Sequence, residues 1–181
     1  NEIYLRLIEI NPDQSPNLYP MIAQNYLLDG DYPKAIEFYE RTIRVAPFYT
    51  PAYRNMAYAY FRQENYDKAI EIYRRLLSLE RAPEGKAEIE GYLAETFYRA
   101  GKMDQAYQSF SRSLQLDPRR QEVRRPLGLL AYYLGKYSEA VQHLSEYIKV
   151  EPEDWEVLQH LGVAYVEMGR IEEATAILER I

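Results

Sequence analysis

Small and large apolar residues follow one another at helical spacing, and this pattern recurs about every 34 residues. Each copy has a small residue on a first helix, and a large residue three positions later typically shares its face. The small residues are Ala23, Ala57, Ala94, Gly128 and Gly162. A second apolar stripe follows, in which an alanine precedes a large apolar residue by four positions. These alanines are Ala35, Ala69, Ala106, Ala140 and Ala174. A repeat of this length predicts stacked pairs of antiparallel helices rather than one closed core.

Turn-forming residues separate the two helices of each copy. Four copies have a glycine there, which accepts the left-handed conformation that ends a helix; these are Gly30, Gly101, Gly135 and Gly169. The second copy has Glu64 and Asn65 instead, and Asn65 is predicted to adopt the left-handed conformation. Prolines then end three of the second helices, at Pro47, Pro118 and Pro152.

This arrangement resembles the tetratricopeptide repeat (TPR), whose signature has the same spacing of small, aromatic, alanine and proline residues. The resemblance covers the whole chain. It implies an all-α fold, an α-solenoid of antiparallel helix pairs wound into a superhelix, with five repeats after an N-terminal half repeat. The family favours a tryptophan near the start of the first helix. The five copies have Tyr19, Tyr53, Glu90, Arg124 and Leu158 there.

The repeat pattern predicts the boundaries of a single TPR array over residues 1–181. Residues 1–12 match the second helix of a preceding repeat, so the chain looks like part of a longer array. The full repeats are expected at 16–49, 50–83, 87–120, 121–154 and, truncated, 155–181. The second repeat lacks its terminal proline at Arg81, and three extra residues predict a longer loop to about residue 86. The turn-favouring residues Pro83 and Gly85 predict proteolytic nicking there. Pro126 predicts a late start or a kink in the first helix of the fourth repeat.

Composition and charge narrow the class of partner. The net charge of −6 argues against general nucleic-acid binding. No apolar run approaches the ~18 residues that a membrane span needs, and the chain has no cysteine for disulfides or thiolate chemistry. We therefore expect a protein or peptide partner, with no nucleic acid and no membrane insertion. Self-association through apolar array ends is also expected, because no polar capping helix follows the fifth repeat. A cytoplasmic location is favoured over a bacterial periplasm.

No residue pattern indicates catalysis, a metal site or a cofactor. His143 and His160 do not stand at metal-ligand spacing. No glycine-rich phosphate-binding loop is present, and Glu172 with Glu173 fits the negative charge favoured at a helix N-terminus. We therefore expect a non-catalytic chain without a cofactor, although an enzyme domain elsewhere in a longer protein stays open.

The tyrosines supply the candidates for a binding groove, which the TPR resemblance places along the first helices. Of the 19 tyrosines, five surplus ones fall on groove-facing positions: Tyr58, Tyr92, Tyr98, Tyr132 and Tyr133. They either pack against the neighbouring repeat or form a partly exposed aromatic stripe. Arginines beside them either pair with helix-surface glutamates or bind carboxylates. The predicted groove residues are Arg54, Asn55, Tyr58, Arg62, Tyr92, Glu95, Tyr98, Arg99, Arg125, Leu129, Tyr132 and Tyr133.

These residues favour a protein-interaction scaffold as the main interpretation of the sequence. Two specialised TPR binding modes, capture of a chaperone C-terminal carboxylate and the asparagine ladder of O-linked N-acetylglucosamine transferase, match only Asn55 and are disfavoured. We predict instead that Tyr98 and Tyr132, beside Arg99 and Tyr133, clamp an apolar residue next to an acidic one. The alternatives are a structural module of a larger assembly, with the groove filled by a flanking segment, and a substrate-recruiting array attached to an enzyme domain.

Overall fold

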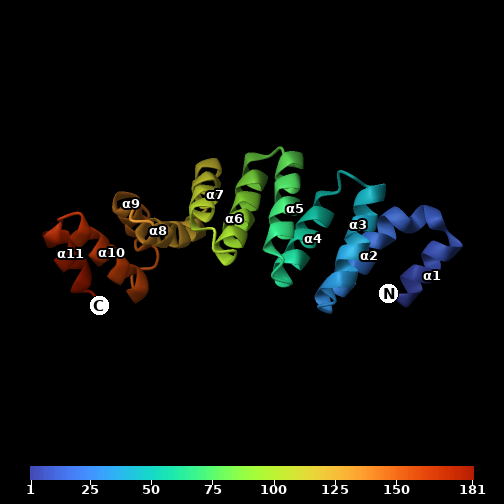
Figure 1. The fold of residues 1–181 in the computed structure, drawn as a ribbon, viewed down its shortest axis with the longest axis horizontal. Coiled ribbons are helices and arrows are strands. Elements are labelled where there is room, and N and C mark those ends of the chain that lie inside the picture. The colour runs from blue at the N-terminus through green and yellow to red at the C-terminus, as the bar shows by residue number, and fades with distance from the viewer. The chain divides into compact units, whose positions relative to one another are not determined.

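α-Helices make up nearly all of the regular structure, as the repeat pattern predicts (Figure 1). The computed structural model describes residues 1–181 and contains eleven α-helices, two 3-10 helices and no strand. The helices fall into two compact units, Asn1–Ala82 (unit 1) and Pro83–Ile181 (unit 2). That the two units continue as a single array stays a prediction. None of the helices combines the length and the apolar character needed to cross a membrane.

Unit 1 consists of one leading helix and two helix pairs. Its helices are α1 (Glu2–Ile10), the 3-10 helix η1 (Pro12–Gln14), α2 (Ser15–Leu28), α3 (Tyr32–Val45), α4 (Thr50–Arg62) and α5 (Tyr66–Leu79). Ile22, Ala23, Ala35 and Tyr39 form the centre of its core, where each is at most 1% exposed. No residue of α1 is fully buried, so this helix packs only through its partly buried side chains.

Unit 2 consists of three helix pairs. Its helices are α6 (Pro83–Arg99), α7 (Met103–Leu116), the 3-10 helix η2 (Gln121–Val123), α8 (Arg124–Tyr133), α9 (Tyr137–Tyr147), α10 (Trp155–Glu167) and α11 (Ile171–Leu178). Leu144, Val157 and Leu161 are fully buried in the core that α8, α9 and α10 share. Trp155 opens α10 and is 65% exposed.

The small residues of the repeat pattern let paired helices approach closely. A Cβ atom added at Gly128 of α8 would lie 2.4 Å from Cδ2 of Leu144 on α9. A Cβ atom at Gly162 of α10 would lie 2.5 Å from Cδ2 of Leu178 on α11. Both distances are far below a van der Waals contact, so only glycine fits without a shift of its neighbour.

The tight turns confirm the role predicted for glycine and correct the one predicted for Asn65. The four turn glycines have φ between 71° and 78°. In the second copy Glu64 has φ 60°, whereas Asn65 has φ −82°. Asn65 is instead the N-cap of α5, where its side chain accepts from the Lys68 amide at 3.4 Å. Asp31 caps α3 in the same way, because its side chain accepts from the Lys34 amide. In both turns the residue just before the N-cap is the left-handed one, which is Gly30 in the first copy and Glu64 in the second.

The longer loop predicted up to residue 86 is wrong, because α6 already begins at Pro83. Proline suits the first turn of a helix, where its missing N–H would have no partner anyway. The negative charge of Glu84 in the same turn interacts favourably with the positive end of the helix dipole. The connection is only Glu80–Ala82, and the Glu80 side chain accepts from the amides of Arg81 and Ala82 at 2.8 and 2.9 Å. The extra residues therefore lengthen a helix, which removes the reason to expect proteolysis at Gly85.

The late start predicted for the first helix of the fourth repeat is confirmed. The 3-10 helix η2 precedes α8, which begins at Arg124 and has Pro126 in its first turn.

Candidate functional site

Two pockets, one in each unit, contain residues of the predicted groove. The unit 1 pocket has a volume of about 320 Å³ and is lined by Pro20, Met21, Gln24, Asn25, Tyr39, Tyr49, Pro51 and Asn55. The unit 2 pocket has a volume of about 280 Å³ and is lined by Glu95, Tyr98, Phe110, Arg125, Pro126, Leu129, Leu130, Tyr133 and Glu156. Asn55 is the predicted residue in the first pocket, and Glu95, Tyr98, Arg125, Leu129 and Tyr133 are those in the second.

A closed hydrogen-bond network lies at the unit 1 pocket. The Asn55 Nδ2 group donates to Gln24 Oε1 at 2.9 Å and to the Tyr39 hydroxyl at 3.1 Å. The Tyr39 hydroxyl donates to the same Gln24 oxygen at 3.1 Å. Burial raises the pKa of Tyr39 to about 12, against the opposing effect of the Asn55 hydrogen bond. The polar groups of this pocket therefore bond chiefly to one another.

Three other predicted residues of unit 1 lie on α4. The Arg62 Nη1 group donates to the Tyr58 hydroxyl at 2.9 Å. Its guanidinium also lies over two aromatic rings, 5.7 Å from the centroid of Tyr58 and 5.4 Å from that of Tyr32. The exposed face of Tyr58 is thus already covered by a cation of the same helix. Arg54 is half-buried and does not line the unit 1 pocket.

The unit 2 pocket has aromatic walls over an apolar floor. Tyr98 of α6 is 45% exposed and Tyr133 of α8 is 62% exposed. Phe110 of α7 and Leu129 of α8 also line the pocket; both are buried and form its apolar floor. No ring contact, cation or hydrogen bond within the chain involves the Tyr98 side chain, whereas the Tyr133 side chain contacts Tyr132 and His160.

Tyr133, rather than the predicted Tyr132, joins Tyr98 at the pocket. Tyr132 is half-buried and packs edge-on against the rings of Tyr137, at 5.9 Å, and His160, at 4.8 Å. His160 Nδ1 lies 2.7 Å from the carbonyl oxygen of Glu156, and Nε2 lies 3.1 Å from the Tyr133 hydroxyl. A carbonyl oxygen only accepts, so Nδ1 carries a proton, and in the neutral imidazole Nε2 then accepts from the Tyr133 hydroxyl. His160 thus holds Tyr133 in place.

Arg125 lies at the rim of the unit 2 pocket in an ion-pair cluster. Its Nε group donates to Asp154 Oδ2 at 2.8 Å, and its Nη2 group donates to Glu156 Oε2. Asp154 is also the N-cap of α10, because it accepts from the Val157 amide at 3.2 Å. Burial would raise the pKa of Asp154, but the hydrogen bonds from Arg125 and Val157 outweigh it and hold this pKa below its usual value. Arg125 is therefore already paired with carboxylates of its own chain.

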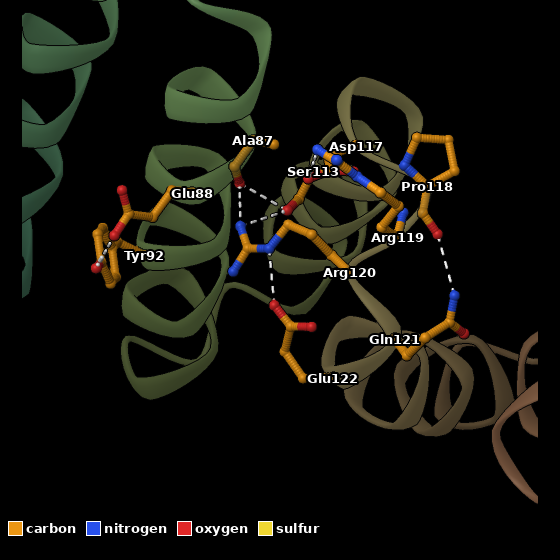
Figure 2. A network of polar contacts seen from close by, with 10 residues as sticks. All are labelled: Ala87, Glu88, Tyr92, Ser113, Asp117, Pro118, Arg119, Arg120, Gln121 and Glu122. Atoms are coloured by element: carbon orange, nitrogen blue, oxygen red, sulfur yellow. Dashed lines mark hydrogen bonds and ion pairs between the residues drawn. The ribbon is translucent and has the colours of Figure 1, made fainter. Parts of the chain in front are cut away.

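Arg120 fixes the connection that leads into α8. Figure 2 shows its guanidinium between the start of α6, the end of α7 and Glu122. The Nη1 group donates to the Ala87 carbonyl and to Ser113 Oγ, which itself donates to the Ala87 carbonyl at 2.6 Å. The Nε group donates to Glu122 Oε1 at 2.8 Å. A Cβ atom at Gly91 would lie 3.1 Å from Arg120 Nη1, so the glycine makes room for the arginine that ties α6, α7 and the linker together.

The remaining predicted residues of α6 do not line the unit 2 pocket. The Tyr92 hydroxyl donates to Glu88 Oε1 at 2.6 Å (Figure 2). Arg99 is exposed at the C-terminal end of α6. The structure therefore brings together only part of the predicted groove.

Sequence reasoning missed Asp154, Glu156 and Phe110 as pocket or rim residues. One signal was present for the first two, since they follow Arg125 by nearly one repeat length and adjacent first helices lie side by side. Phe110 follows Ala106 by four positions, which predicts a core residue and gives no sign that its side chain also lines a pocket.

No group of three His, Cys, Asp or Glu side chains could hold a metal ion. His143 of α9 is half-buried, its Nδ1 atom has no hydrogen-bond partner, and burial together with nearby Arg124 lowers its pKa.

Near the C-terminus, Ile171 and Ile181 are 58% and 62% exposed. Self-association through that surface stays a prediction.

Residues 5–180 match the model of one protein family, described as the C-terminal domain of cilia and flagella-associated protein 70. The chain belongs to this family. Its members are TPR domains, so the predicted TPR assignment is confirmed. No curated protein sequence matches the chain.

Solved structures show the same fold for this family member. It is similar to the crystal structure of MamA, with 20% identity, a TM-score of 0.79, and coverage of 93% of this chain and 90% of MamA. It is also similar to YrrB, described as a TPR protein with an unusual peptide-binding site, with 18% identity and a TM-score of 0.79. That match covers 98% of this chain and 89% of YrrB. At these identities the likeness shows the fold alone, and the predicted TPR solenoid class is confirmed.

Proposed function

We propose that this protein is an interaction scaffold that binds an extended segment of a partner protein in the unit 2 pocket. The observation that carries the proposal is that two well-exposed tyrosines, Tyr98 and Tyr133, line one pocket together with the buried Leu129. Tyrosine is enriched at binding surfaces because one ring offers a large apolar area and a polar hydroxyl. Such rings over an apolar floor are suited to hold a side chain of a partner.

The size of the pocket supports a peptide rather than a free small molecule. Its volume of about 280 Å³ lies at or below the lower end of the range typical of small-molecule sites. One or two side chains of a longer segment would fill it, and the rest of that segment would lie along the first helices. The description of YrrB as a peptide-binding TPR protein supports the same class of ligand.

The structural-module and substrate-recruiting alternatives use the same pocket and differ only in the origin of the bound segment. A flanking segment of a longer protein would fill it in the first case, and a substrate of an attached enzyme domain would fill it in the second. The unit 1 pocket is a weaker candidate, because its polar groups already bond to one another.

The test is selection of random linear peptides on the immobilised protein, followed by measurement of Kd for the selected peptides by fluorescence anisotropy. The double variant Tyr98→Ala with Tyr133→Ala should weaken binding by about 30-fold or more, since loss of a central anchor typically costs ≥ ~2 kcal/mol. The matched control is Tyr49→Ala with Tyr58→Ala, whose tyrosines in unit 1 are 43% and 40% exposed. Equal losses in the two double variants would refute the unit 2 pocket as the binding site.

A further inference from the structure

We infer that the unit 2 pocket accepts a lysine or arginine side chain from the bound segment. This inference rests on the proposed function and names the chemistry of the residue that occupies the pocket. The sequence alone predicts an acidic residue in the bound segment. The structure favours a basic one instead, because the arginine at the rim is already paired with carboxylates.

The arginine at the pocket is neutralised by its own chain. Arg125 forms ion pairs with Asp154 at 2.8 Å and with Glu156. Glu95 is the third carboxylate of this region and lines the pocket together with Arg125 and Glu156. The pocket and its rim therefore have one guanidinium and three carboxylates, and the excess charge there is negative. An incoming acidic side chain would be repelled, whereas a basic one would be attracted.

Two kinds of group at the pocket lack the partner that a basic side chain would supply. The Glu95 carboxylate is exposed and forms no hydrogen bond or ion pair within the chain. Neither the Tyr98 nor the Tyr133 ring has a cation over its face. A tyrosine face attracts a cation, and the apolar floor suits the methylene stem that joins such a cation to its backbone.

Unit 1 provides an internal example of this recognition. Arg62 lies five positions after the small residue Ala57, and Tyr133 lies five positions after Gly128. The position that Tyr133 occupies at the unit 2 pocket is thus occupied in unit 1 by a basic residue. The Arg62 guanidinium lies 5.7 Å from the centroid of the Tyr58 ring. Elsewhere in the chain the Lys136 ammonium lies 4.0 Å from the centroid of Tyr107. Tyrosines of this chain, exposed or half-buried, thus repeatedly take a basic side chain, and those at the unit 2 pocket have none to take.

The test uses the peptides selected on the wild-type protein and asks which residues they share. We expect lysine or arginine at one fixed position in peptides whose binding depends on Tyr98 and Tyr133. Replacing that residue by the neutral isostere citrulline, for arginine, or by norleucine, for lysine, should weaken binding about fivefold or more, and added salt should reduce the difference.

A double-mutant cycle then assigns the charge to its partner. In Glu95→Gln protein the same replacement in the peptide should have little further effect, whereas in the control Glu9→Gln it should cost as much as in the wild type. Glu9 suits this control because it is an exposed glutamate of α1 in unit 1 with no ion pair. Glu95→Lys should weaken binding more than Glu95→Gln.

The outcomes separate the two proposals. Peptides that depend on Tyr98 and Tyr133 but carry only apolar or acidic residues would overturn this inference and leave the proposed function standing. A basic position whose effect is the same in Glu95→Gln protein would also overturn it. Selected peptides that bind equally well without the two tyrosines would overturn both.

Discussion

The pockets of the two units are built on the same repeat pattern, and they differ in how far their polar groups are satisfied. In unit 1, Gln24, Tyr39 and Asn55 bond to one another, and Arg62 covers the ring of Tyr58. In unit 2, Glu95 and the faces of Tyr98 and Tyr133 lack such internal partners. Burial of polar groups is favourable only when they are paired. The unit 1 network therefore serves mainly the fold, whereas the unit 2 groups remain available for a ligand.

The two units also contain tyrosines that differ widely in exposure. Tyr39 is 1% exposed and part of a core, whereas Tyr133 is 62% exposed at a pocket rim. Tyr26 and Tyr165, which the repeat pattern assigns to the core, are only half-buried. Tyr39 is consequently the better structural reference for any test of the pocket tyrosines.

The largest expected effect is the loss of Tyr39 from the core of unit 1. Tyr39→Ala should lower the free energy of unfolding by about 3–5 kcal/mol, because it leaves a cavity and removes the hydrogen bonds of the hydroxyl to Gln24 and Asn55. Tyr133→Ala should lower it by less than about 1 kcal/mol, as expected for an exposed side chain. Urea unfolding followed by circular dichroism measures both values. Similar losses in the two variants would break the distinction between a structural and a binding tyrosine.

The second effect is a loss of stability in alkali through the same residue. Tyrosine in the unfolded chain ionises near pH 10, whereas the pKa of folded Tyr39 is about 12. Its contribution is complete below pH 10 and is lost as pH rises from 10 to 12, because only the unfolded chain then releases the proton. The loss amounts to about 2–3 kcal/mol. Tyr39→Phe should be less sensitive to this pH change in urea unfolding, and a curve parallel to that of the wild type would contradict the assignment.

The third effect concerns the packing that supports the unit 2 pocket. Gly128→Leu should cost about 1–3 kcal/mol, since the new side chain would overlap Leu144 and approach its backbone nitrogen, 3.2 Å from the added Cβ. Gly162→Leu should cost less, because the three closest atoms all belong to the side chain of Leu178, which is 40% exposed and can move. Thermal melts of the two variants show which one loses more stability. A larger loss for Gly162→Leu would show that the contact of α8 with α9 adapts to a larger side chain more easily than the contact of α10 with α11.

The smallest effect is a gain in stability at the turn between α4 and α5, which has no glycine. Glu64 adopts φ 60°, a conformation that costs an L-residue roughly 1–2 kcal/mol. Glu64→Gly should therefore stabilise the protein by about 0.5–1 kcal/mol, after the entropy that glycine adds to the unfolded chain. Asn65→Gly should instead destabilise it, because it removes the cap of α5. Thermal melts of both variants decide whether the left-handed residue is Glu64 or Asn65.

The architecture could be predicted from the sequence because the repeat supplies the same evidence several times. A small residue such as Gly128 is ambiguous alone, but its recurrence at one position in every copy indicates a helix contact. The turns could be predicted for the same reason. The errors lie where one copy departs from the others: aligning Gly30 with Glu64 identifies the left-handed residue, whereas composition alone favours Asn65. At Pro83 the extra residues could extend a loop or a helix, and the proline together with Glu84 in the first turn favours the helix.

The candidate site could be predicted only in part, because its character depends on side-chain pairs between repeats. The sequence alone suggests that the positive charge of Arg125 is free to bind a partner. In the structure Asp154 and Glu156, at the start of α10, neutralise this charge. Each repeat offers several charged residues at similar positions, so sequence spacing does not select the pair. Tyr132 and Tyr133 differ by one position, which on a helix turns the side chain by about 100° and separates a packed ring from an exposed one.

The position of Trp155 determines what the intrinsic fluorescence of this protein can report. It is the single tryptophan of the chain, it opens α10 beside Asp154, and it is 65% exposed. Selective excitation of tryptophan therefore follows unit 2 and the helix end that Arg125 contacts, and soluble quenchers reach the indole in the folded state. Unfolding confined to unit 1 would leave this emission unchanged, so an apparent single transition in fluorescence describes unit 2 rather than the whole chain.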